Sequence, residues 1–265
     1  FRSMPVAQAI LTLAVPTVVS QIITIIYNMA DTFFIGQLGD PKQVAAATLA
    51  MPLFMFMTAL SNLFGVGGAS LISRFLGGGE REKASRCGAF CIWTAVAVSV
   101  LYGLMVLAGR PVLLPVLGAN EETCDMASSY LFWTIGLGAL PTVMNPALAH
   151  LIRSEGYSRQ ASLGVAFGGI LNMVLDPLFI YGLHLQITGA AVATLISNAT
   201  AMIYFLAFIW KMRGVSVLTL SPGMYTLGEH IPAEVISVGM PSFLISMMGT
   251  VSNMVLNHII AGYSN

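Results

Sequence analysis

The feature that most limits how this chain can fold is a series of seven long apolar segments separated by short polar turns. A helix needs about 20 apolar residues to cross a bilayer, and each segment meets that length. Backbone groups cannot stay unpaired in hydrocarbon, so such segments must be helical. The sequence predicts an all-α, polytopic membrane protein with spans at Val6–Leu38, Val44–Ile72, Cys87–Ala108, Met126–Leu151, Ala161–Leu183, Ala190–Trp210 and Ile231–Tyr263.

Composition excludes the main alternatives to a helical membrane protein. Hydrophobic residues make up 57% of the chain and charged residues only 8%, against about 25% charged residues in soluble domains. The alternating pattern of a membrane β-barrel is absent from the sequence. The formal net charge of zero gives no indication of a nucleic-acid partner.

The turns between the spans predict the topology. Gly39-Asp40-Pro41 follows the first span, and Gly109-Arg110-Pro111 is expected to form the turn after the third. With seven spans, nine of the eleven Lys and Arg residues fall on the side of the N-terminus. The positive-inside rule then predicts a multi-pass protein of the cytoplasmic membrane with its N-terminus in the cytoplasm. The nine are Arg2, Arg74, Arg81, Lys83, Arg86, Arg153, Arg159, Lys211 and Arg213.

A weak internal repeat suggests two lobes. When the chain is shifted by 225 residues, Pro16 meets Pro241 and Asn28 meets Asn253, which is the pattern of a parallel repeat of six spans. We therefore expect a six-helix lobe over residues 1–213, a cytoplasmic linker over 214–230, and the start of a second lobe over 231–265. Both ends look cut, so a longer protein is expected.

Two acids lie well inside the spans, Asp31 in the first and Asp176 in the fifth. Each is seven residues from the external end of its span, which places both roughly 10 Å below the outer surface at 1.5 Å per residue. Acids within membrane helices are rare and usually functional. More polar side chains are expected in the same layer: Tyr27, Asn28, Asn172, Thr194 and Asn198.

These oxygen-bearing groups predict a cation site. Protons bind to carboxylates that are removed from water, and Na⁺ prefers carboxylate, amide and hydroxyl oxygens. Pro177, directly after Asp176, is expected to bend its helix and free carbonyl groups at membrane depth. The alternative is that the acids only hydrogen-bond neighbouring helices as structural contacts.

Three stretches resemble the multidrug and toxic compound extrusion (MATE) family. Ala30-Asp31-Thr32-Phe33-Phe34-Ile35-Gly36 is similar to its first helix, and Arg153-Ser154-Glu155-Gly156 to the segment after its fourth. Asn172-Met173-Val174-Leu175-Asp176-Pro177, followed by Gly189-Ala190-Ala191-Val192-Ala193-Thr194, is similar to its fifth and sixth helices.

The resemblance implies twelve helices in two six-helix lobes around a V-shaped cavity. It also implies cation-driven export of small amphipathic or cationic organic molecules, with no enzymatic activity and no cofactor besides the coupling ion, H⁺ or Na⁺. Carried over to this chain, the cation site of prokaryotic members is Asp31, Asn172, Asp176 and Thr194, the residues that depth and helical phase also select. One branch of the family has an acid in the seventh helix, where this chain has Leu256.

The predicted mechanism is antiport by alternating access. Cation binding at Asp31 and Asp176 shifts the first helix about a hinge at Pro16, with Pro177 as a second hinge. The full-length protein is expected to work as a monomer in the lipid bilayer. A flippase for lipid-linked oligosaccharides is one alternative, although such proteins tend to line their cavity with Lys and Arg, which are absent from the predicted spans. A non-transporting membrane scaffold is the other.

Overall fold

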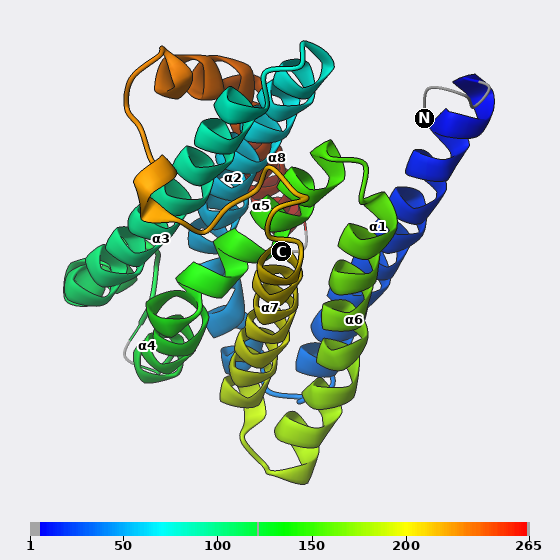
Figure 1. Ribbon diagram of the computed structural model, residues 1–265. Coiled ribbons are helices and arrows are strands. Elements are labelled where there is room, and N and C mark those ends of the chain that lie inside the picture. The colour runs from blue at the N-terminus through cyan, green and yellow to red at the C-terminus, as the bar shows by residue number, and fades with distance from the viewer. Residues whose placement is uncertain (1–5, 121, 264–265) are drawn as a thin grey trace.

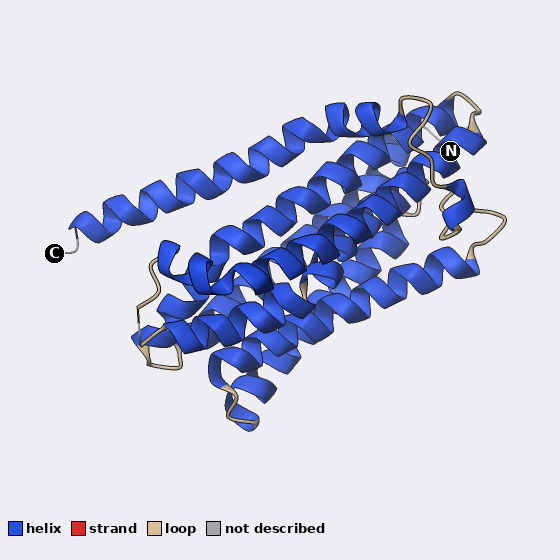
Figure 2. Cartoon of the chain, turned by 90° about the vertical axis from the view of Figure 1, so that its left-hand side faces the viewer, coloured by secondary structure: helices blue, strands red, loops and turns tan. Residues whose placement is uncertain are grey.

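The computed structural model describes residues 6–120 and 122–263, and the side chains of 11–120 and 122–249. Within these ranges the chain forms helices and no strand (Figure 2), which confirms the predicted all-α fold. The α-helices are α1 (Val6–Gly36), α2 (Pro41–Gly77), α3 (Arg81–Val116), α4 (Cys124–Leu131), α5 (Ala139–Ser154), α6 (Ser158–Pro177), α7 (Gln186–Lys211) and α8 (Ile231–Tyr263).

The predicted spans correspond to these helices. Among the described residues, six helices are long and apolar enough to cross a bilayer. The fourth predicted span, Met126–Leu151, is broken: α4 and a π-helical segment, η1 (Phe132–Leu137), join α5 at an angle of 47°, and this bent pair counts as a seventh span. A second π-helical segment, η2 (Leu178–Gly182), continues α6 beyond Pro177. π segments inside helices are rare and occur often at functional sites.

The turn predicted at Gly109-Arg110-Pro111 is wrong, because α3 continues through it to Val116. A proline inside a helix leaves the carbonyl four residues earlier without its N–H partner. Here that carbonyl belongs to Leu107, and Arg110 Nε donates to its oxygen at 3.2 Å. The arginine side chain thus supplies the hydrogen bond that the proline removes, and the helix does not end.

Close packing through glycine sets the positions of the helices around the site. In Figure 1, α1 and α6 run side by side, with α7 on the other side of α6. A Cβ on Gly164 of α6 would lie 2.4 Å from the ring of Phe205 on α7, and one on Gly169 would lie 2.8 Å from the ring of Tyr27 on α1. Only glycine permits these approaches, so α6 is held firmly between its two neighbours.

The last helix, α8, packs against α2. A Cβ on Gly239 would lie 2.1 Å from the carbonyl oxygen of Leu63, and one on Gly67 would lie 2.4 Å from that of Val235. Beyond this crossing α8 diverges from the bundle (Figure 2).

The segment between α7 and α8 is fastened to the rest of the bundle. Glu155, at the end of α5, accepts hydrogen bonds from Ser216 Oγ at 2.7 Å and from the backbone N–H groups of Val217 and Leu218 at 2.7 and 3.0 Å. Arg81 Nη2 donates to the carbonyl of Val215 at 2.7 Å. This segment therefore lies at the same end of the bundle as the α5–α6 turn.

Candidate functional site

The centre of the candidate site is one turn of α6. Asn172 and Asp176 are four residues apart and share a face of the helix, and their side chains are 3% and 0% exposed. Asn172 Nδ2 donates to Asp176 Oδ1 at 3.2 Å and reaches Thr194 Oγ1 of α7 at 3.5 Å. Three of the four predicted cation ligands thus form one hydrogen-bonded group.

Asp31 approaches this group from α1. Its side chain is half-buried, and Asp31 lies close enough to Asp176 for its charge to act on that carboxylate. The outer end of α1 is held there by Tyr181 of η2, whose hydroxyl donates to the carbonyl of Phe34 at 2.8 Å. Asp31 therefore lies near the group formed by Asn172, Asp176 and Thr194, and no hydrogen bond joins it to them among the described residues.

Each carboxylate keeps one oxygen without a partner. Asp31 Oδ1 and Asp176 Oδ2 are buried, and no group of the described residues donates a hydrogen bond to either atom. Buried polar atoms are nearly always paired, and an unpaired buried carboxylate oxygen is costly. A proton or a cation such as Na⁺ would satisfy both atoms, so the donor set fits either ion.

A small polar chamber adjoins the carboxylates on the side of the N-terminus. Its volume is about 30 Å³, which is room for about two water molecules. Asn198 of α7 accepts from Asn145 Nδ2 at 2.8 Å and donates to Thr142 Oγ1 at 3.3 Å, so a hydrogen-bonded amide network forms part of the chamber wall. Its lining comes from α1, α5, α6 and α7: Tyr27, Asn145, Val165, Gly168, Gly169, Asn172, Thr194, Ser197 and Asn198.

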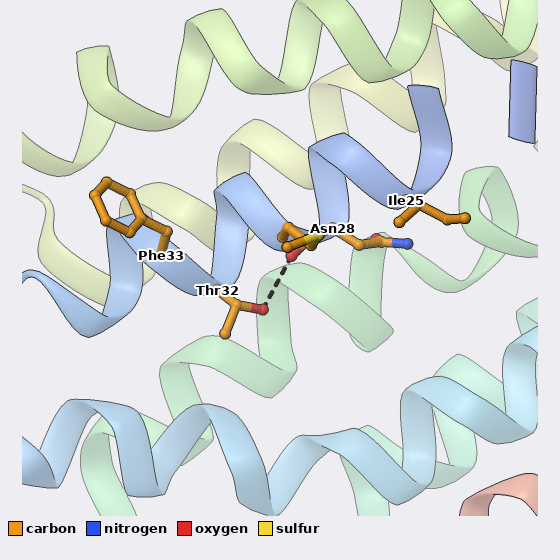
Figure 3. Close-up of a pocket in the computed structure, with 5 residues that line it drawn as sticks. Ile25, Asn28, Thr32 and Phe33 are labelled. Atoms are coloured by element: carbon orange, nitrogen blue, oxygen red, sulfur yellow. Dashed lines mark hydrogen bonds between the residues drawn. The ribbon is translucent and has the colours of Figure 1, made fainter. Parts of the chain in front are cut away.

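The structure places Tyr27 and Asn198 in this chamber, as predicted, but Asn28 does not belong to it. Successive residues of an α-helix are rotated by about 100°, which turns Asn28 away from the face that carries Tyr27. Asn28 is exposed and lines a shallow hollow of about 530 Å³ on the other side of α1, with Ile25, Met29, Thr32 and Phe33 (Figure 3). Thr32 Oγ1 donates to the Asn28 carbonyl at 2.9 Å in the same view.

The two predicted hinges, Pro16 and Pro177, differ in whether the α-helix continues past the proline. Pro177 ends the α-helical part of α6, and the π-helical turn of η2 follows at once, so the backbone is irregular directly after Asp176. Pro16 lies inside α1, which continues as one helix from Val6 to Gly36. In this structure Pro16 therefore sits in an unbroken helix.

Sequence reasoning missed three residues of the site. Tyr130 of α4 lies close enough to Asp31 and Asp176 to interact electrostatically with both carboxylates. Asn145 and Ser197 line the chamber, and each has a buried oxygen without a partner. All three are polar residues inside predicted spans, so a complete list of such residues would have included them, but only the fold shows that they converge.

The sequence comparisons agree with this geometry. The MatE family model matches residues 16–178. The multidrug export protein MepA of Staphylococcus saprophyticus is 32% identical over all of this chain and 58% of its own length, and that of Staphylococcus aureus is 30% identical with the same coverage. The chain thus spans less than two thirds of the curated relatives that it matches.

Solved structures show the same arrangement of helices. A structure of MATE in the straight conformation superposes with a TM-score of 0.88 at 28% identity, over 96% of this chain and 56% of the other. One in the bent conformation gives 0.84, over 95% and 56%. A transporter of the MOP superfamily from Pyrococcus furiosus gives 0.85 at 28% identity, over 95% and 55%. With a family model that matches more than half of its residues, the chain belongs to the MATE family.

Proposed function

We propose that this chain forms the N-terminal lobe and first C-lobe helix of a multidrug exporter that is driven by a monovalent cation. The observation that carries the proposal is the half-buried Asp31 and the fully buried Asp176, each with one buried oxygen that has no partner among the described residues, beside a polar chamber inside an apolar bundle. A purely structural pair would be expected to have its oxygens hydrogen-bonded to neighbouring helices. The relatives that cover the whole chain are named as multidrug export proteins, which supports the transport class.

The cation, H⁺ or Na⁺, would be held by the carboxylates of Asp31 and Asp176, whose atoms Asp31 Oδ1 and Asp176 Oδ2 have no hydrogen-bond partner among the described residues. Asn172 orients the Asp176 carboxylate through its 3.2 Å hydrogen bond, and Thr194 adds a hydroxyl oxygen at the edge of the site. Binding of one monovalent cation would neutralise one of the two negative charges at the site and draw α1 toward α6. Because coupling requires different affinities in two conformations, the movement of α1 must change the cation site and the cargo site together.

The cargo is a small amphipathic or cationic organic molecule. The hollow on α1 supports this chemistry, because Ile25, Met29 and Phe33 supply apolar area while Asn28 and Thr32 supply polar atoms (Figure 3). The hollow lies on the face of α1 opposite Tyr27. One helix therefore contributes residues to the cargo site on one side and the cation ligand Asp31 on the other.

The protein lies in the cytoplasmic membrane as a monomer with its N-terminus in the cytoplasm. The charge asymmetry supports this orientation, because nine of the eleven Lys and Arg residues fall on the N-terminal side of the predicted spans. Apolar side chains such as Leu101 and Leu104 of α3, both 58% exposed, supply lipid-facing surface.

The test uses the full-length protein in proteoliposomes with an imposed Na⁺ or pH gradient. Wild-type protein should expel a cationic dye in response to one of the two gradients, which identifies the ion. Asp31→Asn should abolish the response, whereas Asp125→Asn, the same change at an exposed position, should leave it intact. Gradient-driven efflux at the wild-type rate by Asp31→Asn would refute the cation site.

A further inference from the structure

A second polar cluster lies in the seam between α1, α5 and α6, at the end that holds the N-terminus. Its centre is Ser20 of α1, which is 1% exposed. Ser20 Oγ donates to the Thr17 carbonyl at 2.9 Å and lies 3.3 Å from Ser162 Oγ of α6. Arg153 Nη2 of α5 donates to Ser20 Oγ at 3.4 Å. One residue from each of the three helices thus meets at this point.

The cluster is aligned with the cation site along the same helix faces. On α1, Ser20 precedes Tyr27 by seven residues, and on α6, Ser162 precedes Gly169 by seven and Asp176 by fourteen. A separation of seven residues is close to two helical turns, so these residues share one face and lie about 10 Å apart along it. The cluster therefore lies about two helical turns from the residues that line the polar chamber, toward the end that holds the N-terminus.

Arg153 brings an unpaired positive charge to this cluster. Its guanidinium is half-buried, and its Nε is buried without a hydrogen-bond partner. Among the described residues no carboxylate lies within ion-pair distance of it. The nearest acid in sequence, Glu155, is taken up by the segment before α8 through Ser216 and Val217. The charge is therefore not neutralised locally.

We propose that Arg153 is an electrostatic barrier that closes the cytoplasmic end of the cation path. The inference rests on the proposed function, because an antiporter must not let its coupling ion cross without the conformational change. A fixed positive charge beside a narrow polar path excludes cations. The hydrogen bond to Ser20 fastens the barrier to α1, so a shift of α1 on cation binding also moves the guanidinium.

The size of the effect follows from the geometry. A unit positive charge about 10 Å from a cation, at the effective dielectric constant of about 20 that suits partly buried sites, lowers its occupancy roughly tenfold. A cation that passes closer to the guanidinium meets a larger barrier. Loss of the charge should therefore raise cation leak at least about tenfold.

The experiment measures cation flux without cargo, in proteoliposomes that contain the full-length protein under the gradient that drives wild-type efflux. Arg153→Gln should leak at least about ten times faster than wild type, while Arg153→Lys should stay near wild type. Arg159→Gln removes the same charge at an exposed position of the same end and should not leak. Leak by Arg153→Gln at the wild-type rate, or equal leak by Arg159→Gln, would overturn the barrier.

A second pair of variants keeps the arginine, in case Arg153→Gln fails to fold. Ser20→Asp places a carboxylate beside Arg153 and neutralises it, whereas Ser20→Asn is of similar size and uncharged. Leak through Ser20→Asp and not through Ser20→Asn supports the barrier, and equal flux through both contradicts it. If wild-type protein itself shows no gradient-driven efflux, the proposed function fails. If wild-type protein shows efflux but the variants do not leak, the barrier fails and the proposed function stands.

Discussion

Replacing Gly239 of α8 by alanine tests how closely the second lobe must approach the first. The new Cβ would lie 2.1 Å from the carbonyl oxygen of Leu63, whereas carbon and oxygen normally approach no closer than about 3.3 Å. The two backbones must therefore separate by roughly 1 Å at the crossing. No rotamer change relieves the clash, because both atoms are fixed by the helices.

That separation has two costs. Pulling packed atoms apart by 0.5–1 Å forfeits about a quarter to a half of their attraction, and overpacking of this kind typically costs about 1–3 kcal/mol. The hydrogen bond from Asn62 Nδ2 to Ser246 Oγ, 2.9 Å long and in the same interface, would be stretched, and its loss costs about 0.5–1.5 kcal/mol more. We expect Gly239→Ala to destabilise the full-length protein by about 2–4 kcal/mol.

The assay is thermal unfolding of the purified full-length protein in detergent, together with gradient-driven efflux. Gly249→Ala on the same helix is the matched control, because none of the described residues lies within 4 Å of the position of its Cβ, and alanine favours helix over glycine by about 1 kcal/mol. Gly239→Ala should unfold at a lower temperature than wild type, and Gly249→Ala should not. Equal stability of the two variants would show that the α2–α8 crossing is not as tight as described.

Three further predictions concern the cation site. Asp176→Asn should abolish cation-driven efflux and, by removing a fully buried charge, raise the unfolding temperature measured in cation-free buffer; a lower temperature would contradict the unpaired-charge argument. Asn172→Ala should weaken the cation dependence of efflux at least about tenfold, whereas Asn28→Ala should leave it unchanged; the reverse order would refute the placement of the two amides. Gly169→Ala should displace the ring of Tyr27 and lower cation affinity, measured by equilibrium ion binding; unchanged affinity would show that the position of this ring does not affect the cation site.

The sequence alone predicted the spans and most of the candidate ligands. The requirement for about 20 apolar residues and the cost of a charge in hydrocarbon are both read along the chain, so Asp31 and Asp176 stand out without any knowledge of packing. Asn172 followed from helical phase, because a residue four positions before Asp176 must share its face. Thr194 followed from its depth in the sixth span and from the family resemblance.

Only the tertiary structure decided which side of α1 faces the lobe. In a soluble helix the polar face marks solvent, but in a membrane helix apolar residues can face either lipid or protein, and α1 carries polar residues on more than one side. Asn28 and Tyr27 are adjacent polar residues of α1, so polarity alone does not show which of them faces the lobe. Packing against Gly169 of α6 separates them, and it turns Tyr27 to the chamber and Asn28 to the hollow.

The same reason explains the residues found only in the fold. Asn145 belongs to α5, which meets the chain before it at an angle of 47° after η1 and packs against α2, α3 and α7. The helix α3 continues past Pro111 because the Arg110 side chain bonds the carbonyl that proline frees. Length and charge determined which segments cross the membrane, whereas contacts between helices determined which of their faces meet.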